Sequence, residues 1–239
     1  MDIKLTTTVG EIVAKDFRTA SIFSKYGIDF CCRGNVDMQT ACKEKSIDIE
    51  TLQKEIEQIT QTPNTEFDFN SWSLDFLADY IENTYHKYIK ETLPVLLEYL
   101  QKIVEAHGIG HPELAEIADL FSHSAADLTA HLQKEERILF PLIRELVKKQ
   151  ESGHAADIRR MSVESPIATM MYEHTVEGDR FDKISQLSGG YTTPEDACNT
   201  YRTAYAMLNE FEQKLHSHIA LENNILFPKA IELEKLLNR

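Results

Sequence analysis

The chain has 239 residues, 42% of them apolar, which suits one large domain or a large domain with a small one. Its 25 basic and 39 acidic residues give a net charge of −14, which disfavours nucleic-acid phosphates and anionic membrane surfaces as partners. The N-terminus lacks a basic end followed by an apolar stretch, and no run approaches the roughly 20 apolar residues of a membrane span. These features predict a globular, cytoplasmic protein that binds neither nucleic acid nor membranes.

The first 60 residues are expected to form a small helical module. Thr8 and Glu11 have the spacing of a capping box ahead of apolar residues at helical intervals, and this helix is expected to end at Gly27. A loop then leads to two short helices at about 38–45 and 47–59. A module of about 60 residues is barely large enough to bury an apolar core by itself.

Residues 61–72 break the helical pattern and are interpreted as a linker, after which residues 73–239 read as a four-helix bundle. The fold class predicted is therefore all-α. The four helices are expected at 73–106, 112–149, 166–187 and from about 194 onward. Pro141 and Pro228 fall at equivalent places in the second and fourth helices and are expected to bend them.

An eleven-residue motif occurs twice in the predicted bundle. His131-Leu-Gln-Lys-Glu135-Glu-Arg-Ile-Leu-Phe-Pro141 and His218-Ile-Ala-Leu-Glu222-Asn-Asn-Ile-Leu-Phe-Pro228 agree at six positions. Residues i and i+4 lie on the same helical face, so each copy directs an imidazole and a carboxylate to one place.

A lone histidine in the other helix of each half completes the repeat. His86 and His174 are 88 residues apart, and the two motifs are 87 apart, which indicates a repeated helical hairpin. Each half then contributes two histidines and one glutamate on apolar helical stripes. Burying Glu135 and Glu222 without compensation would cost several kcal/mol each, so the pattern predicts a metal centre inside the bundle. The predicted ligands are His86, His131, Glu135, His174, His218 and Glu222.

Donor counting suggests two ions. If both carboxylates bridge, each ion receives two ring nitrogens and two carboxylate oxygens, and an oxo or hydroxo bridge would add a fifth donor. A remaining position would be open to dioxygen, nitric oxide or peroxide. Imidazole and carboxylate without thiolate suit iron or manganese better than zinc, and two non-haem iron ions are the favoured choice because open positions suit redox chemistry.

The chain resembles the Repair of Iron Centres family, hemerythrin-like di-iron proteins with a cysteine-bearing module in front. The resemblance rests on the two H-x-x-x-E motifs together with Lys25-Tyr-Gly-Ile-Asp-Phe-Cys-Cys-Arg-Gly-Asn35. It implies repair of iron-sulfur clusters damaged by nitric oxide or oxidants, by donation of iron, with damaged iron-sulfur proteins as partners. The sequence leaves open whether two copies form a homodimer.

The resemblance implies the same six ligands, with Glu135 and Glu222 bridging. It also matches Glu173 and Asp127 to acidic positions that line an iron path, although a surface acid is an equally good interpretation. Two alternatives to iron donation remain. One is a nitric oxide or peroxide reductase at the same centre, and the other is an oxygen-binding or oxygen-sensing protein.

The cysteines are too few and too unevenly spaced for a disulfide framework and are expected to be reduced. Adjacent Cys31 and Cys32 could act as a redox pair, as a transient iron or persulfide ligand, as a site of nitrosation, or simply as packed loop residues. Arg33 is a candidate for lowering the cysteine pKa. Cys42 and Cys198 are interpreted as structural, with Cys198 inside the fourth helix. His107 and His111 are interpreted as loop residues, and His123, His154 and His216 as surface or supporting groups.

Overall fold

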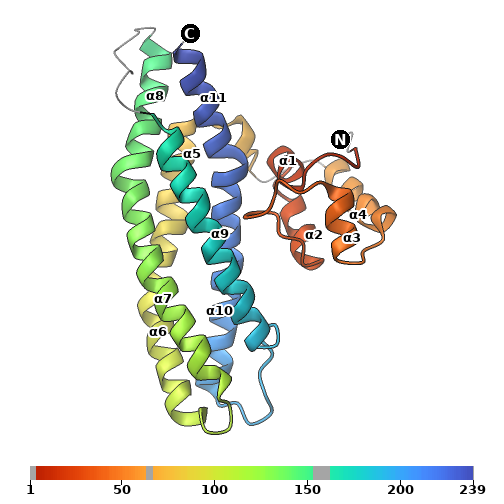
Figure 1. Ribbon diagram of the computed structural model, residues 1–239, viewed down its shortest axis with the longest axis vertical. Helices are drawn as coiled ribbons and strands as arrows, with labels where there is room; N and C mark the ends of the chain where they lie inside the picture. The colour runs from red at the N-terminus through yellow and green to blue at the C-terminus, as the bar shows by residue number, and fades with distance from the viewer. Residues whose placement is uncertain (1–3, 63–66, 153–161, 239) are drawn as a thin grey trace. The chain divides into compact units, whose positions relative to one another are not determined.

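The computed structural model describes residues 4–62, 67–152 and 162–238, and Figure 1 shows their arrangement. The regular secondary structure of these residues is helical, apart from an isolated antiparallel β-bridge between Thr8 and Asp37. The predicted all-α fold is confirmed. Part of the predicted linker, residues 63–66, lies outside the described residues, as does His154.

The N-terminal helices are α1 (Val9–Lys15), α2 (Thr19–Lys25), α3 (Met38–Glu44) and α4 (Ile49–Gln61). After a 3₁₀ turn, η1 (Phe69–Ser71), the long helices are α5 (Leu74–Ile81), α6 (Lys87–His107), α7 (Glu113–Lys134), α8 (Phe140–Ser152), α9 (Glu164–Leu187), α10 (Asn199–Leu221) and α11 (Phe227–Leu237). Three π-helical turns connect successive helices without a break: η2 (Glu82–His86), η3 (Glu135–Leu139) and η4 (Glu222–Leu226).

Contacts divide the chain into two compact units. One contains residues 1–78, 142–167 and 216–239, and the other contains residues 79–141 and 168–215. In the second unit, α6, α7, α9 and α10 run side by side as four helices (Figure 1). The sequence-based division at residues 61–72 stays a prediction.

The predicted first helix is two helices. Thr8 and Glu11 form the expected capping box, and Gly27 has the left-handed backbone, with φ of +63°. Asp16, however, is extended and ends α1. Its carboxylate pairs with the Arg18 guanidinium at 2.6 Å and accepts the Arg18 backbone N–H, so a local side-chain contact replaces the next helical turn.

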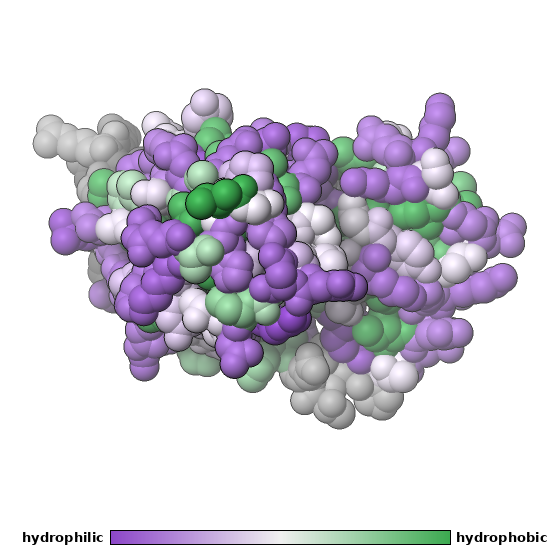
Figure 2. Space-filling view, turned by 90° about the horizontal axis from the view of Figure 1, so that it is seen from below, coloured by the Kyte–Doolittle hydropathy of each residue, from purple (hydrophilic) through white to green (hydrophobic). Residues whose placement is uncertain are grey.

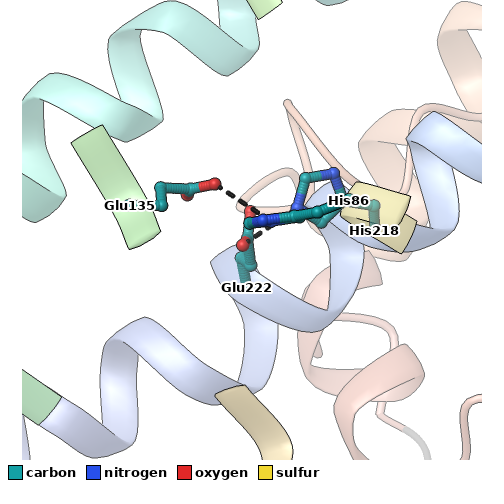
Figure 3. Close-up of side chains that lie close together, drawn as sticks. All are labelled: His86, Glu135, His218 and Glu222. Atoms are coloured by element: carbon teal, nitrogen blue, oxygen red, sulfur yellow. Dashed lines mark ion pairs between the residues drawn. The ribbon is translucent and has the colours of Figure 1, made fainter. Parts of the chain in front are cut away.

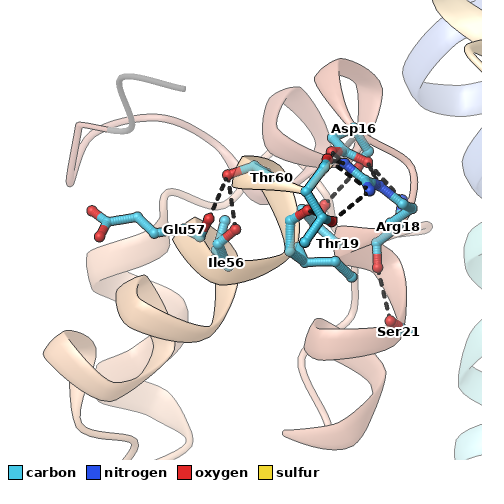
Figure 4. A network of polar contacts seen from close by, with 9 residues as sticks. Asp16, Arg18, Thr19, Ser21, Ile56, Glu57 and Thr60 are labelled. Carbon is cyan, nitrogen blue, oxygen red and sulfur yellow. Dashed lines mark hydrogen bonds and ion pairs between the residues drawn. The ribbon is translucent and has the colours of Figure 1, made fainter. Parts of the chain in front are cut away.

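Arg18 also ties this break to the end of α4. Its guanidinium donates to the Thr62 carbonyl and hydroxyl oxygens at 3.2 and 3.0 Å. In the same region the Thr60 hydroxyl donates back to the Ile56 carbonyl (Figure 4). The module is therefore held by polar contacts as well as by its small apolar core.

The helices of the bundle begin and end close to their predicted positions, except at the start of the fourth. Gly189 and Gly190 both have positive φ and end the third helix, as their sequence predicted. The prediction that the fourth helix starts near Pro194 is wrong, because regular helix begins only at Asn199. Cys198 therefore lies just before α10 and is exposed.

Aromatic packing holds the second unit together away from the predicted ligands. The rings of Phe181 and Phe211 are stacked with centroids 5.7 Å apart, and Phe121 meets Phe211 edge-on at 5.5 Å. All three side chains are fully buried. Burying each such side chain contributes roughly 1.5–3 kcal/mol and keeps three helices in register.

No helix in the described ranges is both long and apolar enough for a membrane span. The face shown in Figure 2 is mainly hydrophilic, with small separated apolar areas, as the large excess of acidic residues suggests.

Candidate metal centre

Each predicted ligand lies on a long helix or on one of its π turns. His131, His174 and His218 lie in α7, α9 and α10. His86 ends η2, whereas Glu135 and Glu222 begin η3 and η4. Such π turns are rare and occur frequently at functional sites.

The structure brings all six predicted ligands together in two overlapping groups. The first is His86, Glu135, His218 and Glu222, shown in Figure 3, and the second is His131, Glu135, His174 and Glu222. Within each group, one potential donor atom per residue lies within 4.8 Å of the others. All six side chains are buried, and both carboxylates belong to both groups.

The distances inside these groups fit a bound cation. His86 Nε2 is 3.3 Å from Glu135 Oε2, and His218 Nε2 is 3.0 Å from Glu222 Oε1. His131 Nε2 and His174 Nε2 face each other at 3.1 Å. Ring nitrogens and buried carboxylate oxygens that converge in this way form a donor set for a cation such as iron, manganese or zinc.

A second carboxylate orients the His86 ring. His86 Nδ1 lies 2.8 Å from Glu136 Oε1, and Lys90 donates to both oxygens of Glu136 at 2.6 and 2.8 Å. Burial raises the pKa of Glu136, but the hydrogen bonds from Lys90 and His86 outweigh it and hold the pKa below its ordinary value. Glu136 is thus an ionised acceptor that places the proton on Nδ1 and leaves the Nε2 lone pair directed at the donor group.

His131 has the same kind of support. Its Nδ1 is 2.9 Å from Glu173 Oε2, and Lys134 pairs with the other oxygen of Glu173. Burial again raises the pKa of Glu173, while Lys134 and His131 bring it below its ordinary value. Glu173, which the resemblance matched to an iron path, therefore contacts a predicted ligand directly. Asp127, matched in the same way, is exposed and pairs with Arg180 at 2.7 Å, as a surface acid would.

Arg180 also pairs with a buried acid, Glu177, that the sequence motifs do not include. Glu177 lies one turn beyond His174, is buried, and pairs with Arg180 at 2.5 Å. Burial raises the pKa of Glu177 to about 7, although the Arg180 charge opposes the shift. A carboxyl group with this pKa changes charge near neutral pH.

The Cys31–Cys32 loop is organised by Asp29. Asp29 Oδ1 accepts hydrogen bonds from the backbone N–H groups of Cys31 at 3.0 Å and Cys32 at 2.9 Å, and its Oδ2 accepts the Arg33 N–H at 3.1 Å. The Cys31 and Cys32 sulfurs are 3.6 Å apart. All four cysteines are thiols outside any disulfide, as expected.

The expectation that Arg33 lowers the cysteine pKa is wrong for Cys31. That side chain is only 3% exposed. Its hydrogen bond with Cys32, its burial and the nearby Asp29 carboxylate all hold the pKa of Cys31 well above its ordinary value. Cys31 is thus a protected thiol rather than a ready thiolate.

Comparison with known proteins accounts for both parts of the chain. The family model of the hemerythrin HHE cation binding domain matches residues 77–230, and a domain of unknown function, DUF542, matches residues 5–60. The iron-sulfur cluster repair protein ScdA of Staphylococcus haemolyticus is 34% identical over 92% of this chain and 96% of its own length. The iron-sulfur cluster repair protein YtfE of Yersinia pestis is 34% identical over 91% of this chain and 93% of its own length.

The chain belongs to the iron-sulfur cluster repair protein family. Its hemerythrin-type cation-binding domain contains all six converging residues, and its N-terminal domain contains the Cys31–Cys32 loop. The family predicted from the sequence is thereby confirmed. The role of the six residues as metal ligands remains a prediction.

In this member of the repair family, the repeated motifs did not predict the residues that support the ligands. Lys90 lies four residues after His86, and Lys134 lies three residues after His131, so helical spacing could have suggested both. The partnership between Glu136 and His86 joins two different helices. Spacing along one helix contains no signal for such a contact.

Proposed function

We propose that this chain repairs damaged iron-sulfur clusters by storing two iron ions at the six converging residues and delivering iron from them. The observation that carries the proposal is that Glu135 and Glu222 belong to both donor groups. Carboxylates shared in this way are suited to bridging two cations in a helical bundle. The proposed process is that of the relatives, which are named iron-sulfur cluster repair proteins.

Iron is the cation that fits the proposal best. The donors are imidazole nitrogens and carboxylate oxygens, a set that suits iron and manganese, and a protein that rebuilds iron-sulfur clusters needs iron as its cargo. Iron stored here would supply the metal that a damaged cluster has lost.

The side chains divide the work of holding this cargo. His86 and His218 belong to one group, His131 and His174 to the other, and the two glutamates belong to both. Glu136 and Glu173 orient the His86 and His131 rings through Nδ1. Burial of all six side chains keeps water away from the donors, which favours retention of iron until an acceptor is present.

The test is recovery of aconitase activity in a lysate treated with nitric oxide. Protein purified and loaded with iron without oxygen is expected to restore activity, and metal-free protein is expected not to. Glu222→Ala should fail because it removes an oxygen donor shared by both groups. Glu232→Ala, which removes an exposed acid from α11, is the matched control and should repair normally.

Failure of the fully loaded protein to restore aconitase would contradict iron donation. Steady consumption of nitric oxide by the same sample, with an electron donor supplied, would instead assign the centre to reduction of that molecule.

The Cys31–Cys32 loop belongs to this proposal as the thiol-bearing segment that acts on the damaged acceptor in the cytoplasm. Cys32, which is half-buried, is the more accessible of the two thiols, since Cys31 is buried. Changing both residues to serine is expected to abolish aconitase recovery while the iron content stays normal. Cys198→Ser, at an exposed cysteine outside the loop, is the control and should leave repair intact. Undiminished repair by the double variant would remove the thiols from the mechanism.

A further inference from the structure

The two copies of the repeated motif differ immediately after the shared glutamate. In the first copy Glu135 is followed by Glu136 and Arg137, and in the second copy Glu222 is followed by Asn223 and Asn224. Glu136 supports the His86 ring. The asparagine at the equivalent position therefore serves another purpose.

Both asparagines bind the backbone of the cysteine loop. Asn223 Nδ2 donates to the Cys31 carbonyl oxygen at 3.0 Å, and Asn224 Nδ2 donates to the Phe30 carbonyl oxygen at 2.9 Å. Phe30 also meets the ring of His216 edge-on, with centroids 6.4 Å apart. The two hydrogen bonds join segments more than 190 residues apart in the sequence. The asparagine segment begins at the residue directly after Glu222.

Two glycines make space for this contact. A Cβ atom at Gly10 would overlap Asn224 Oδ1, and one at Gly34 would lie 3.1 Å from it. The Gly10 N–H donates to the Gly34 carbonyl oxygen at 2.7 Å, so α1 and the end of the cysteine loop form one surface around Asn224. Side chains larger than glycine would push the asparagine away from the loop.

The apolar residue next in the motif shows the same asymmetry. Ile225 is 1% exposed in η4, against which α1 packs, whereas the equivalent Ile138 in η3 is 53% exposed. The π turn of the second copy is therefore covered by the N-terminal segment. Apolar packing and two amide hydrogen bonds act together at this contact.

We propose that Asn223 and Asn224 are positioning residues that couple cation binding at Glu222 to the reactivity of the Cys31 thiol. Glu222 begins the π turn that contains both asparagines. A bound cation fixes the Glu222 carboxylate and with it this turn. The asparagines then hold the cysteine loop in the conformation that buries Cys31. Without a cation, the Glu222 carboxylate loses the ligand that holds it in place, the turn loosens, and the loop exposes the thiol more often.

This coupling rests on the proposed binding of cations at Glu222 and adds a regulatory role to it. Cys31 is protected while iron is present and becomes reactive when iron has been delivered. The thiol thus reports the loading state of the centre.

The experiment is alkylation of the whole protein with iodoacetamide, followed at each cysteine by mass spectrometry, with ferrous iron bound and after chelation. In the wild type, Cys31 is expected to react about tenfold more slowly with iron bound than after chelation. A factor of about ten in rate corresponds to the free energy of roughly one hydrogen bond. In the double variant Asn223→Ala, Asn224→Ala, Cys31 should react fast in both states. Arg137→Ala, at the position equivalent to Asn224 in the first copy, should behave like the wild type.

Other cysteines provide internal references. Cys198 is exposed and should react at one rate in every sample, whereas Cys42 is buried and should stay protected wherever the N-terminal module is folded.

A further variant, Gly10→Ala, displaces the Asn224 side chain without changing that residue, and should also speed the alkylation of Cys31.

Equal Cys31 rates in the loaded and chelated wild type would overturn the coupling, as would an unchanged iron effect in the double asparagine variant. Iron bound is measured in the same samples. Absence of bound iron would defeat the proposed function as well, whereas normal iron binding with unresponsive thiols would defeat only the coupling.

Discussion

At the level of single residues, His131 shows how the predicted ligands are prepared. Its Nδ1 is held by Glu173, and its Nε2 faces His174 and Glu135. Fixing one ring nitrogen determines the direction of the other and the atom that carries the proton. The carboxylates outside the donor groups are therefore expected to contribute to metal affinity as well as to packing.

Glu173→Gln is expected to weaken ferrous iron binding by about 10–100-fold, because a neutral amide holds the His131 ring less firmly and makes it less basic. Competition with a coloured chelator measures the affinity. Asp127→Asn, at an exposed acid outside the donor groups, is the control and should bind iron like the wild type. Equal affinity in both variants would show that Glu173 does not support the ligand.

Glu177 predicts a pH dependence of stability. Its pKa is raised from 4.5 to about 7 in the folded chain, so the folded state holds this proton more tightly than the unfolded state. The contribution of Glu177 to the free energy of unfolding therefore falls as the pH rises from about 4.5 to 7, by up to about 3 kcal/mol.

Glu177→Gln should remove this loss, so the variant gains stability relative to the wild type as the pH rises through that window. Urea unfolding of metal-free protein at several pH values measures the difference. Asp119→Asn, at an exposed acid, should keep the pH profile of the wild type. Parallel profiles for wild type and Glu177→Gln would contradict the assignment.

At the level of elements, the π turns explain where helical periodicity misleads. The Phe140 N–H donates to Glu135 O, five residues back, and the next residue, Pro141, has no N–H to donate. The wide turn thus falls where proline interrupts the α-helical hydrogen bonds. Because the turn contains an extra residue, Leu139 is buried and Ile138 is exposed, although α-helical spacing puts Ile138 on the face of His131, seven residues before it.

The exposure difference between Ile138 and Ile225 leads to an expected difference in stability. Ile225→Ala should lower the free energy of unfolding by about 3 kcal/mol, because it leaves a cavity under α1, whereas Ile138→Ala should cost less than about 1 kcal/mol. Urea unfolding of metal-free protein compares these equivalent positions. Equal losses would mean that the N-terminal segment does not cover η4.

The same elements show how far the sequence predicts the site. Repeated i, i+4 spacing found His131, Glu135, His218 and Glu222, since neighbours on one helical face follow from helix geometry alone. The matching offset between His86 and His174 added the other two converging residues. The contacts of Glu136 with His86 and of Asn223 with Cys31 join residues distant in sequence. Those contacts depend on how different segments pack, which periodicity does not contain. The break at Asp16 was missed because the apolar spacing continues across it.

At the level of the whole molecule, cation binding should be linked to folding. A ligand that binds only the folded chain adds about 2.7 kcal/mol at a concentration one hundred times its dissociation constant. Ferrous iron is therefore expected to raise the Tm by about 5–10 °C relative to chelated protein. Thermal unfolding without oxygen measures the shift, and a wild-type Tm that iron leaves unchanged would contradict binding in the folded bundle.

The most direct test of two ions sharing two carboxylates is the number of ferrous ions bound per chain in anaerobic titrations of the wild type and two variants. We expect two ions for the wild type and one for His174→Ala, because His174 belongs to one donor group. Neither site should be intact in Glu222→Ala, because Glu222 belongs to both groups. A single ion in the wild type, or two ions still bound tightly by Glu222→Ala, would contradict the shared-carboxylate centre.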